Sequence, residues 1–206
     1  YPWTAMYNMI FYANTVIEGV MEARADVTTD SREQLLAEAY CLRAFVHFDL
    51  INLYAKWYDP ATAATDKAVP LSLKIDIGQS FIPTTVEKVY EQVLADLQEA
   101  EKYMQVEQQT GAYLYRFSKK ALKAFQARVY LYHQDWKQAQ KTAESLLAAC
   151  PLEDLTTTEA QPWTYTSKEA ILALETVSST VMKEDMYVLD NISGKFNQIK
   201  EGDKYV

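Results

Sequence analysis

Residues 119–151 constrain the fold most, because they read as two helices joined by a tight turn. In the first, KKALKAFQARVYLYHQ, apolar residues recur at helical spacing and leave little polar surface, so we expect a mostly buried helix. The second, DWKQAQKTAESLLAACP, is amphipathic, with Asp135 placed to cap its first turn and Pro151 placed to end it. Its apolar stripe comprises Trp136, Ala139, Ala143, Leu146, Leu147 and Cys150. The sequence therefore predicts a helical hairpin.

Three further helices are predicted before this hairpin. Apolar residues step by three and four over residues 3–24, and residues 32–54 are apolar around most of the helix circumference, which predicts a central position. Residues 84–104 carry one apolar stripe, and Thr84 and Glu87 have the spacing of a capping box. We expect this helix to pack on residues 32–54 as a second hairpin.

The predicted fold class is mainly α, with tetratricopeptide-like helical hairpins, long loop excursions and a less regular C-terminal segment. We expect residues 1–206 to form a single helical-repeat domain that is part of a longer protein. Its helices would cover about residues 1–151, and residues 152–206 would be irregular. Within that last segment, the run EAILALETV (residues 169–177) is compatible with either a buried strand or a short helix.

Several polar residues fall on the predicted core faces. Asn14 lies on the apolar face of the first helix, while Arg43 and His47 lie four residues apart on the central helix. A buried charge must be paired or reach solvent, so we expect a polar network that ties neighbouring helices together. We interpret His47 as a structural histidine, since no second metal ligand is spaced to join it.

Two loops interrupt the helical pattern. Residues 55–83 hold three of the six prolines and no sustained period, and loops of this length are often functional. Residues 105–117 form a polar loop. Sugar C–H faces stack on flat aromatic rings, so loop aromatics are the ligand-binding candidates in a chain that is 13% aromatic. These candidates are Trp57, Tyr58, Tyr113, Tyr115, Trp163 and Tyr165. Aromatics on helix faces, including Tyr132 and Trp136, are interpreted as packing.

The composition and the motif search argue against other classes of function. A net charge of −8 repels phosphate backbones and anionic lipid heads, so no nucleic-acid partner is expected. Two histidines and two cysteines at unrelated spacings predict no metal site, and five glycines leave little room for a phosphate loop. We therefore expect a protein that is not an enzyme and has no cofactor. Cys41 and Cys150 read as small core residues, although two cysteines in an exported protein can pair.

These residues carry two resemblances to known families. Tyr130, Trp136, Ala139 and Pro151 have the spacing of the 34-residue tetratricopeptide repeat, although Gln134 stands where that repeat prefers glycine. The run RFSKKALKAFQARVYLYHQDW resembles a landmark of the SusD/RagB-like outer-membrane nutrient-binding family. Residues 37–54 resemble that family's earlier landmark, AEA..LRA..HF.L..LY. The resemblance covers nearly all of this chain but only the amino-proximal portion of a typical member.

The resemblance implies a surface-exposed lipoprotein of the outer membrane. Such proteins capture glycans and deliver them to a SusC-like TonB-dependent transporter for nutrient uptake. Membrane association would then depend on a lipid anchor that is not present in this chain, since no lipidation cysteine lies near Tyr1. The alternative is a tetratricopeptide-like protein–protein interaction module without carbohydrate binding. The sequence leaves both open.

Overall fold

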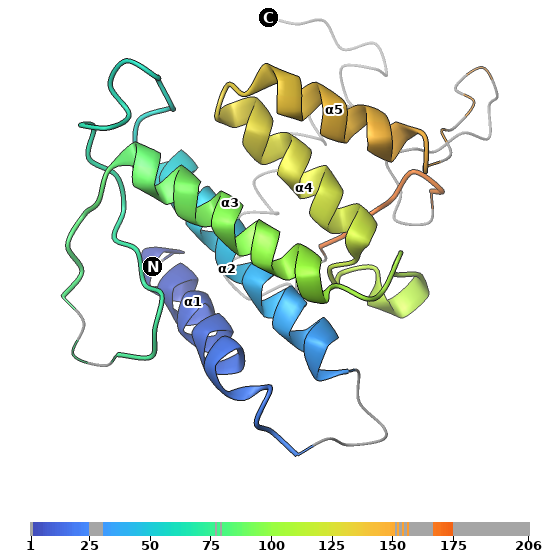
Figure 1. Ribbon diagram of the computed structural model, residues 1–206, viewed down its shortest axis with the longest axis horizontal. Helices are drawn as coiled ribbons and strands as arrows, with labels where there is room; N and C mark the ends of the chain where they lie inside the picture. Colours follow the sequence, from blue (N-terminus) through green and yellow to red (C-terminus); the bar gives the residue numbers. More distant parts are fainter. Residues whose placement is uncertain are drawn as a thin grey trace, which may run out of the picture. The chain divides into compact units, whose positions relative to one another are not determined.

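A computed structural model describes residues 2–24, 31–76, 78, 80–150, 152, 154, 156 and 167–174. Over these residues the chain forms five α-helices and one short 3-10 helix, and no strand (Figure 1). They are α1 (Pro2–Gly19), α2 (Arg32–Tyr54), α3 (Val86–Tyr103), η1 (Gly111–Tyr113), α4 (Lys119–Tyr132) and α5 (Trp136–Leu147). The predicted mainly-α fold class is confirmed.

The chain divides into two compact units, Tyr1–Ala173 and Leu174–Val206. All five helices belong to the first unit. Of the second unit, only Leu174 is among the described residues. The prediction of a single helical-repeat domain stays a prediction.

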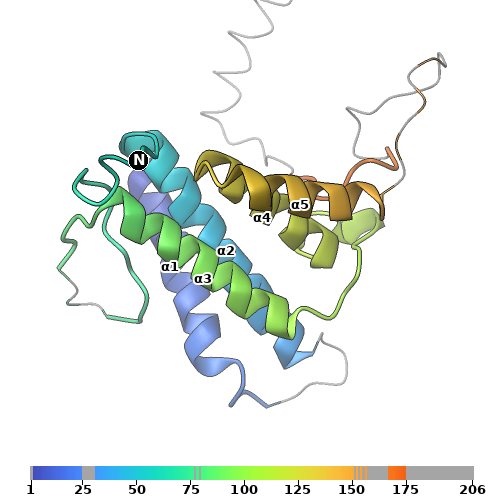
Figure 2. The same cartoon turned by 45° about the horizontal axis from the view of Figure 1, so that its top comes forward.

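Helix α2 is the centre of the first unit, as its apolar circumference predicts. It packs against α1 and α3, while α4 pairs with α5 and contacts α3 (Figures 1 and 2). Phe45 and Phe48 of α2 each lie 5.4 Å, centroid to centroid, from the ring of Phe125 on α4. These ring contacts connect the three-helix group to the α4–α5 hairpin.

Side-chain caps explain where most of the helices begin. Ser31, Thr85, Ser118 and Asp135 each accept a hydrogen bond from the backbone N–H three residues later. The cap predicted at Thr84 is therefore wrong by one residue. The Thr84 backbone is occupied elsewhere, because its carbonyl accepts from the Ala68 N–H at 2.8 Å.

Helix α5 differs from its prediction. Its apolar stripe was expected to be an inner face, but Ala139 is its one buried residue. Trp136 is 61% exposed and Leu147 is 57% exposed. The physical reason is that α5 packs mainly on α4, so within the described parts of the chain few residues cover the rest of its stripe.

Candidate ligand-binding loops

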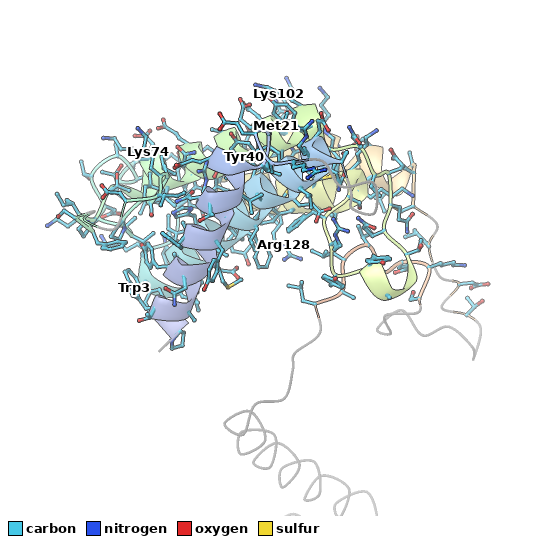
Figure 3. The ribbon with its side chains drawn as sticks, turned by 90° about the horizontal axis from the view of Figure 1, so that it is seen from below. Trp3, Met21, Tyr40, Lys74, Lys102 and Arg128 are labelled. Atoms are coloured by element: carbon cyan, nitrogen blue, oxygen red, sulfur yellow. The ribbon has the colours of Figure 1, made fainter. Side chains whose placement is uncertain are left out.

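The loop between α2 and α3, residues 55–85, is fixed to α1 by hydrogen bonds. We call it the long loop. Figure 3 labels Lys74 on the part of this loop that lies beside α1. Three α1 side chains bond to its backbone: Tyr7 to the Pro70 carbonyl (2.8 Å), Asn14 to the Ser72 and Lys74 carbonyls (3.2 Å each) and Glu18 to the Ile75 N–H (2.8 Å). The stretch that lacks regular structure is thus bonded to α1 at four positions between residues 70 and 75.

A buried ion pair lies beneath this attachment. The Arg43 guanidinium donates to both carboxylate oxygens of Asp96, at 2.8 and 2.6 Å, so that α2 and α3 are joined by a bidentate pair. Its Nη1 donates to the Asn14 Oδ1 at 2.9 Å and to the Leu73 carbonyl at 3.1 Å. Burial raises the pKa of Asp96, while Arg43 opposes that shift. One guanidinium therefore links three helices and the long loop.

His47 completes the network. Its Nδ1 lies 3.0 Å from the Arg43 carbonyl, which can only accept, and its Nε2 lies 3.4 Å from the Ser72 N–H, which can only donate. The partners therefore assign a neutral imidazole with its proton on Nδ1. Burial lowers the pKa of His47 to about 4, which favours the same neutral form. The network that the sequence predicts for Asn14, Arg43 and His47 is present.

The first candidate residues stand at the start of the long loop. Trp57 is 84% exposed. The neighbouring Tyr58 is half-buried, with its ring 4.2 Å from the His133 ring and 5.2 Å from the Tyr90 ring. The Gln134 Nε2 also donates to the Tyr58 carbonyl at 2.8 Å. Tyr58 therefore closes the edge of the core, and Trp57 presents a free indole face.

The last part of the long loop, just before α3, carries apolar residues that the sequence reasoning did not select. Phe81 is 55% exposed and Ile82 is 71% exposed. Phe81 also makes an edge contact with Tyr7, with ring centroids 5.2 Å apart. The signal that could have identified Phe81 and Ile82 is their place directly before Pro83, in a loop that has neither helical nor strand periodicity.

The loop between α3 and α4, residues 104–118, carries the next two candidates. We call it the tyrosine loop. The buried Gln34 accepts from the Gln105 and Val106 N–H groups at 2.9 and 3.0 Å. Glu38 accepts two bonds from the Arg116 guanidinium, at 3.0 and 2.9 Å. Two residues near the start of α2 thus hold both ends of this loop.

Tyr113 and Tyr115 project from the tyrosine loop and are 57% and 55% exposed. The Arg116 guanidinium lies 6.0 Å from the Tyr113 ring centroid, which is at the limit of a cation–π contact. Two other candidates, Trp163 and Tyr165, lie outside the described residues. The nearby segment 167–174 has neither helix nor strand, and its Ala173 N–H donates to the Leu114 carbonyl.

The candidates do not form one site. Trp57 lies just beyond the last residue of α2, whereas the tyrosine loop is attached to Gln34 and Glu38 in the first turns of that helix. Since a helix rises 1.5 Å per residue, these attachments lie roughly 25 Å apart along α2. The structure therefore presents two separate aromatic surfaces. A small sugar could contact one of them, and only an extended chain could contact both.

Several exposed aromatics on helices also escaped the sequence reasoning. Tyr12 and Tyr54 are 67% and 47% exposed, and Tyr132 and Trp136, interpreted above as packing, are 49% and 61% exposed. A position at a helix end was the available signal for Tyr54, Tyr132 and Trp136. Periodicity assigns a helix face, but it does not tell whether a partner covers that face.

Among the described residues, no three His, Cys, Asp or Glu side chains are grouped as metal ligands. No helix in the described part of the chain is both long and apolar enough to cross a bilayer. The fold offers a helical scaffold that holds loops with exposed aromatic rings.

Comparison with known proteins identifies the family. Residues 1–131 match the SusD-like family that is described as starch-binding and associating with the outer membrane. The chain therefore belongs to the SusD-like family, whose members are carbohydrate-binding proteins associated with that membrane.

Individual relatives agree with this assignment. The chain is 32% identical over 151 residues to the SusD-like protein P38 of Formosa agariphila, a match that covers 71% of this chain and 26% of that protein. A SusD superfamily protein from Bacteroides fragilis aligns at 27% identity with a TM-score of 0.68, over 85% of this chain and 40% of that one. A SusD-like carbohydrate binding protein from Bacteroides vulgatus aligns at 21% identity and TM-score 0.70, over 85% and 37%. The chain thus spans about a quarter of the length of the curated relative.

Proposed function

We propose that this protein captures glycans at the outward face of the outer membrane for uptake through a SusC-like TonB-dependent transporter. Membership of a starch-binding, outer-membrane family supports the ligand class and the location. The role is binding rather than catalysis, and the helices serve as the frame from which the loops contact the sugar. A lipid anchor would tie the protein to the membrane.

The exposure of the Trp57 indole is the observation that carries the proposal. An indole that is 84% exposed gains little from packing, so its flat face is open to a ligand. Its large flat face is suited to the C–H face of a sugar ring, and nearby loop amides and carboxylates can bond to hydroxyls. The loop start is ordered, because the Ala55 N–H still bonds to the Ile51 carbonyl and Tyr58 is packed.

The tyrosine loop supports a second contact with the same ligand. Tyr113 and Tyr115 are exposed, and they lie at the opposite end of α2 from Trp57. Two surfaces separated by roughly 25 Å favour an oligosaccharide or polysaccharide over a monosaccharide. When one long ligand engages both surfaces, the second contact is intramolecular and raises the total affinity.

Titration calorimetry with starch-type and β-glucan oligosaccharides of increasing length tests this function. We expect affinity to rise with chain length and to fall about 3- to 10-fold in Trp57→Ala, as the loss of one aromatic contact predicts. Trp136→Ala is the matched control, since it removes an exposed indole from α5 instead of from a loop. Equal binding by the wild type and Trp57→Ala would overturn the role of Trp57, and flat titrations with every glycan would overturn the function.

The alternative, a protein–protein interaction module, has one observation in its favour. Leu131, Tyr132, Trp136 and Leu147 are all about half exposed or more on the α4–α5 hairpin. Aromatic and aliphatic residues of this kind are typical of interface cores. The same two variants distinguish the functions, because a protein partner on the hairpin would be lost in Trp136→Ala and retained in Trp57→Ala.

A further inference from the structure

The turn between α4 and α5 has a backbone conformation that normally selects glycine. Gln134 has φ of 61° and is the non-glycine residue with positive φ in the described part of the chain. The Gln134 N–H bonds to the Leu131 carbonyl and the Asp135 N–H bonds to the Tyr130 carbonyl. These two bonds form a Schellman motif, in which glycine is the common choice because it has no Cβ. A glutamine here carries backbone strain that glycine would avoid.

The glutamine side chain makes a contact that glycine cannot make. Its Nε2 donates to the Tyr58 carbonyl at 2.8 Å, across 76 positions of sequence. The preceding residue adds a second contact, since the His133 ring lies 4.2 Å from the Tyr58 ring. The hairpin turn therefore holds Tyr58 by its backbone and by its ring.

This double contact bears directly on Trp57. The indole is 84% exposed, so its own packing does little to fix its position. The position of the indole is set by the backbone on either side of Trp57. The last turn of α2 precedes Trp57, and the packed Tyr58 follows it. The Lys56 ammonium also bonds to Asp66 at 2.5 Å, but the lysine is largely exposed, and such pairs are weak. Gln134 is thus the residue whose side chain bonds to the backbone directly after Trp57.

We propose that Gln134 is a positioning residue that holds Trp57 in place for a saccharide ligand, an inference that rests on the proposed function. The strained turn places the Gln134 side chain where it bonds to the loop, so the strain and the order of the loop depend on the same residue. A fixed indole loses less conformational freedom when the ligand binds, so the strain in the turn is matched by a gain in affinity. Stability and binding therefore respond to this residue in opposite directions.

The test is Gln134→Gly, with two companions. In Gln134→Gly the turn relaxes, so we expect an unchanged or higher melting temperature together with a loss of glycan affinity of about 3- to 10-fold. Gln134→Glu keeps the side-chain length and the strain but replaces the donor with a carboxylate, so affinity falls without any gain in melting temperature. Gln138→Glu makes the same charge change on α5 and should bind as the wild type does. A purely structural role would lower stability and binding together.

A ligand-free measurement separates this inference from the proposed function. The order parameter of the Trp57 indole N–H and the amide exchange of residues 56–59 should report a looser segment in Gln134→Gly and Gln134→Glu. Unchanged values in both variants overturn the positioning role, whether or not the wild type binds glycan. If the wild type binds no glycan while the segment loosens, the proposed function fails and the positioning of Trp57 stands.

Discussion

The long loop and the tyrosine loop both present exposed aromatic rings, but they are held by different kinds of interaction. The long loop is fixed above the Arg43–Asp96 pair, whose side chains are 7% and 2% exposed. The tyrosine loop is fixed partly by the Arg116–Glu38 pair, whose side chains are each 16% exposed. Both pairs are bidentate, so the geometry is matched and the solvent exposure differs.

This difference teaches how each loop should fail. Charges withdrawn from water depend on one another, so loss of one partner leaves an uncompensated charge in the core. Charges nearer the surface can be rehydrated and are screened by salt. We therefore expect damage at the long loop to spread through α1, α2 and α3, and damage at the tyrosine loop to stay local.

Removal of the buried carboxylate should give the largest effect. Asp96→Asn leaves the Arg43 guanidinium buried without its counter-charge, so we expect the free energy of unfolding to fall by about 3–5 kcal/mol. Urea denaturation followed by circular dichroism measures the loss. Glu99→Gln, which removes a carboxylate from the exposed side of α3, should change it by less than about 0.5 kcal/mol. Similar losses in the two variants would refute the distinction between buried and accessible pairs.

Acid should weaken the long loop through His47. Its folded pKa is about 4, against 6.5 for the free side chain, so the unfolded chain binds more protons between these values. Above pH 6.5 the histidine is neutral in both states and its titration costs no stability. As the pH falls toward 4, protonation of the unfolded chain lowers the free energy of unfolding by about 3 kcal/mol. A proton on Nε2 would also face the Ser72 N–H, so the bond between His47 and Ser72 is lost with it.

The measurement is the difference in unfolding free energy between the wild type and His47→Gln from pH 7 to pH 4. Glutamine offers a neutral acceptor near the Nε2 position and does not titrate. The wild type should lose more stability than the variant over this window. The contributions of the Asp and Glu carboxylates are common to both proteins and cancel in the difference. Parallel curves for the two proteins would contradict the buried neutral histidine.

A matched pair of buried amides sharpens the comparison further. Asn14 and Gln34 are both fully buried, and each bonds to the backbone of one loop. Asn14→Ala and Gln34→Ala should each cost about 1–3 kcal/mol, because polar groups lose their partners. Hydrogen exchange should rise at residues 70–75 in the first variant and at residues 105–106 in the second. Exchange that rises in both loops for either variant would show that the loops are coupled.

The sequence predicts the scaffold better than it predicts the loops. Periodicity finds the five α-helices seen among the described residues, because an apolar stripe at a spacing of three or four needs only local information. Asn14, Arg43 and His47 could be identified as a network because polar residues on an apolar face require partners. Their backbone partners could not be named, since the Ser72 and Leu73 carbonyls that they meet carry no side-chain signal.

The site residues show the same limit more clearly. Exposure of Trp57 follows from its loop position, but the packing of Tyr58 depends on His133, which is far away in the sequence. Gln134 was visible as a departure from glycine, yet its bond to Tyr58 is a long-range fact. Trp136 was assigned to the core because its helix is amphipathic, and its exposure reflects how few of the described residues cover α5.

The smallest effect should come from the ion pair of the tyrosine loop. A double-mutant cycle with Glu38→Gln and Arg116→Gln should give a coupling free energy of about 1 kcal/mol, above most surface pairs because two parallel bonds form. About 1 M sodium chloride should reduce this value, whereas the loss in Asp96→Asn should hardly change, because screening acts weakly on buried charges. A salt-independent coupling for Glu38 and Arg116 would show that the tyrosine loop is held in the same way as the long loop. The two aromatic surfaces would then stand on equally rigid supports.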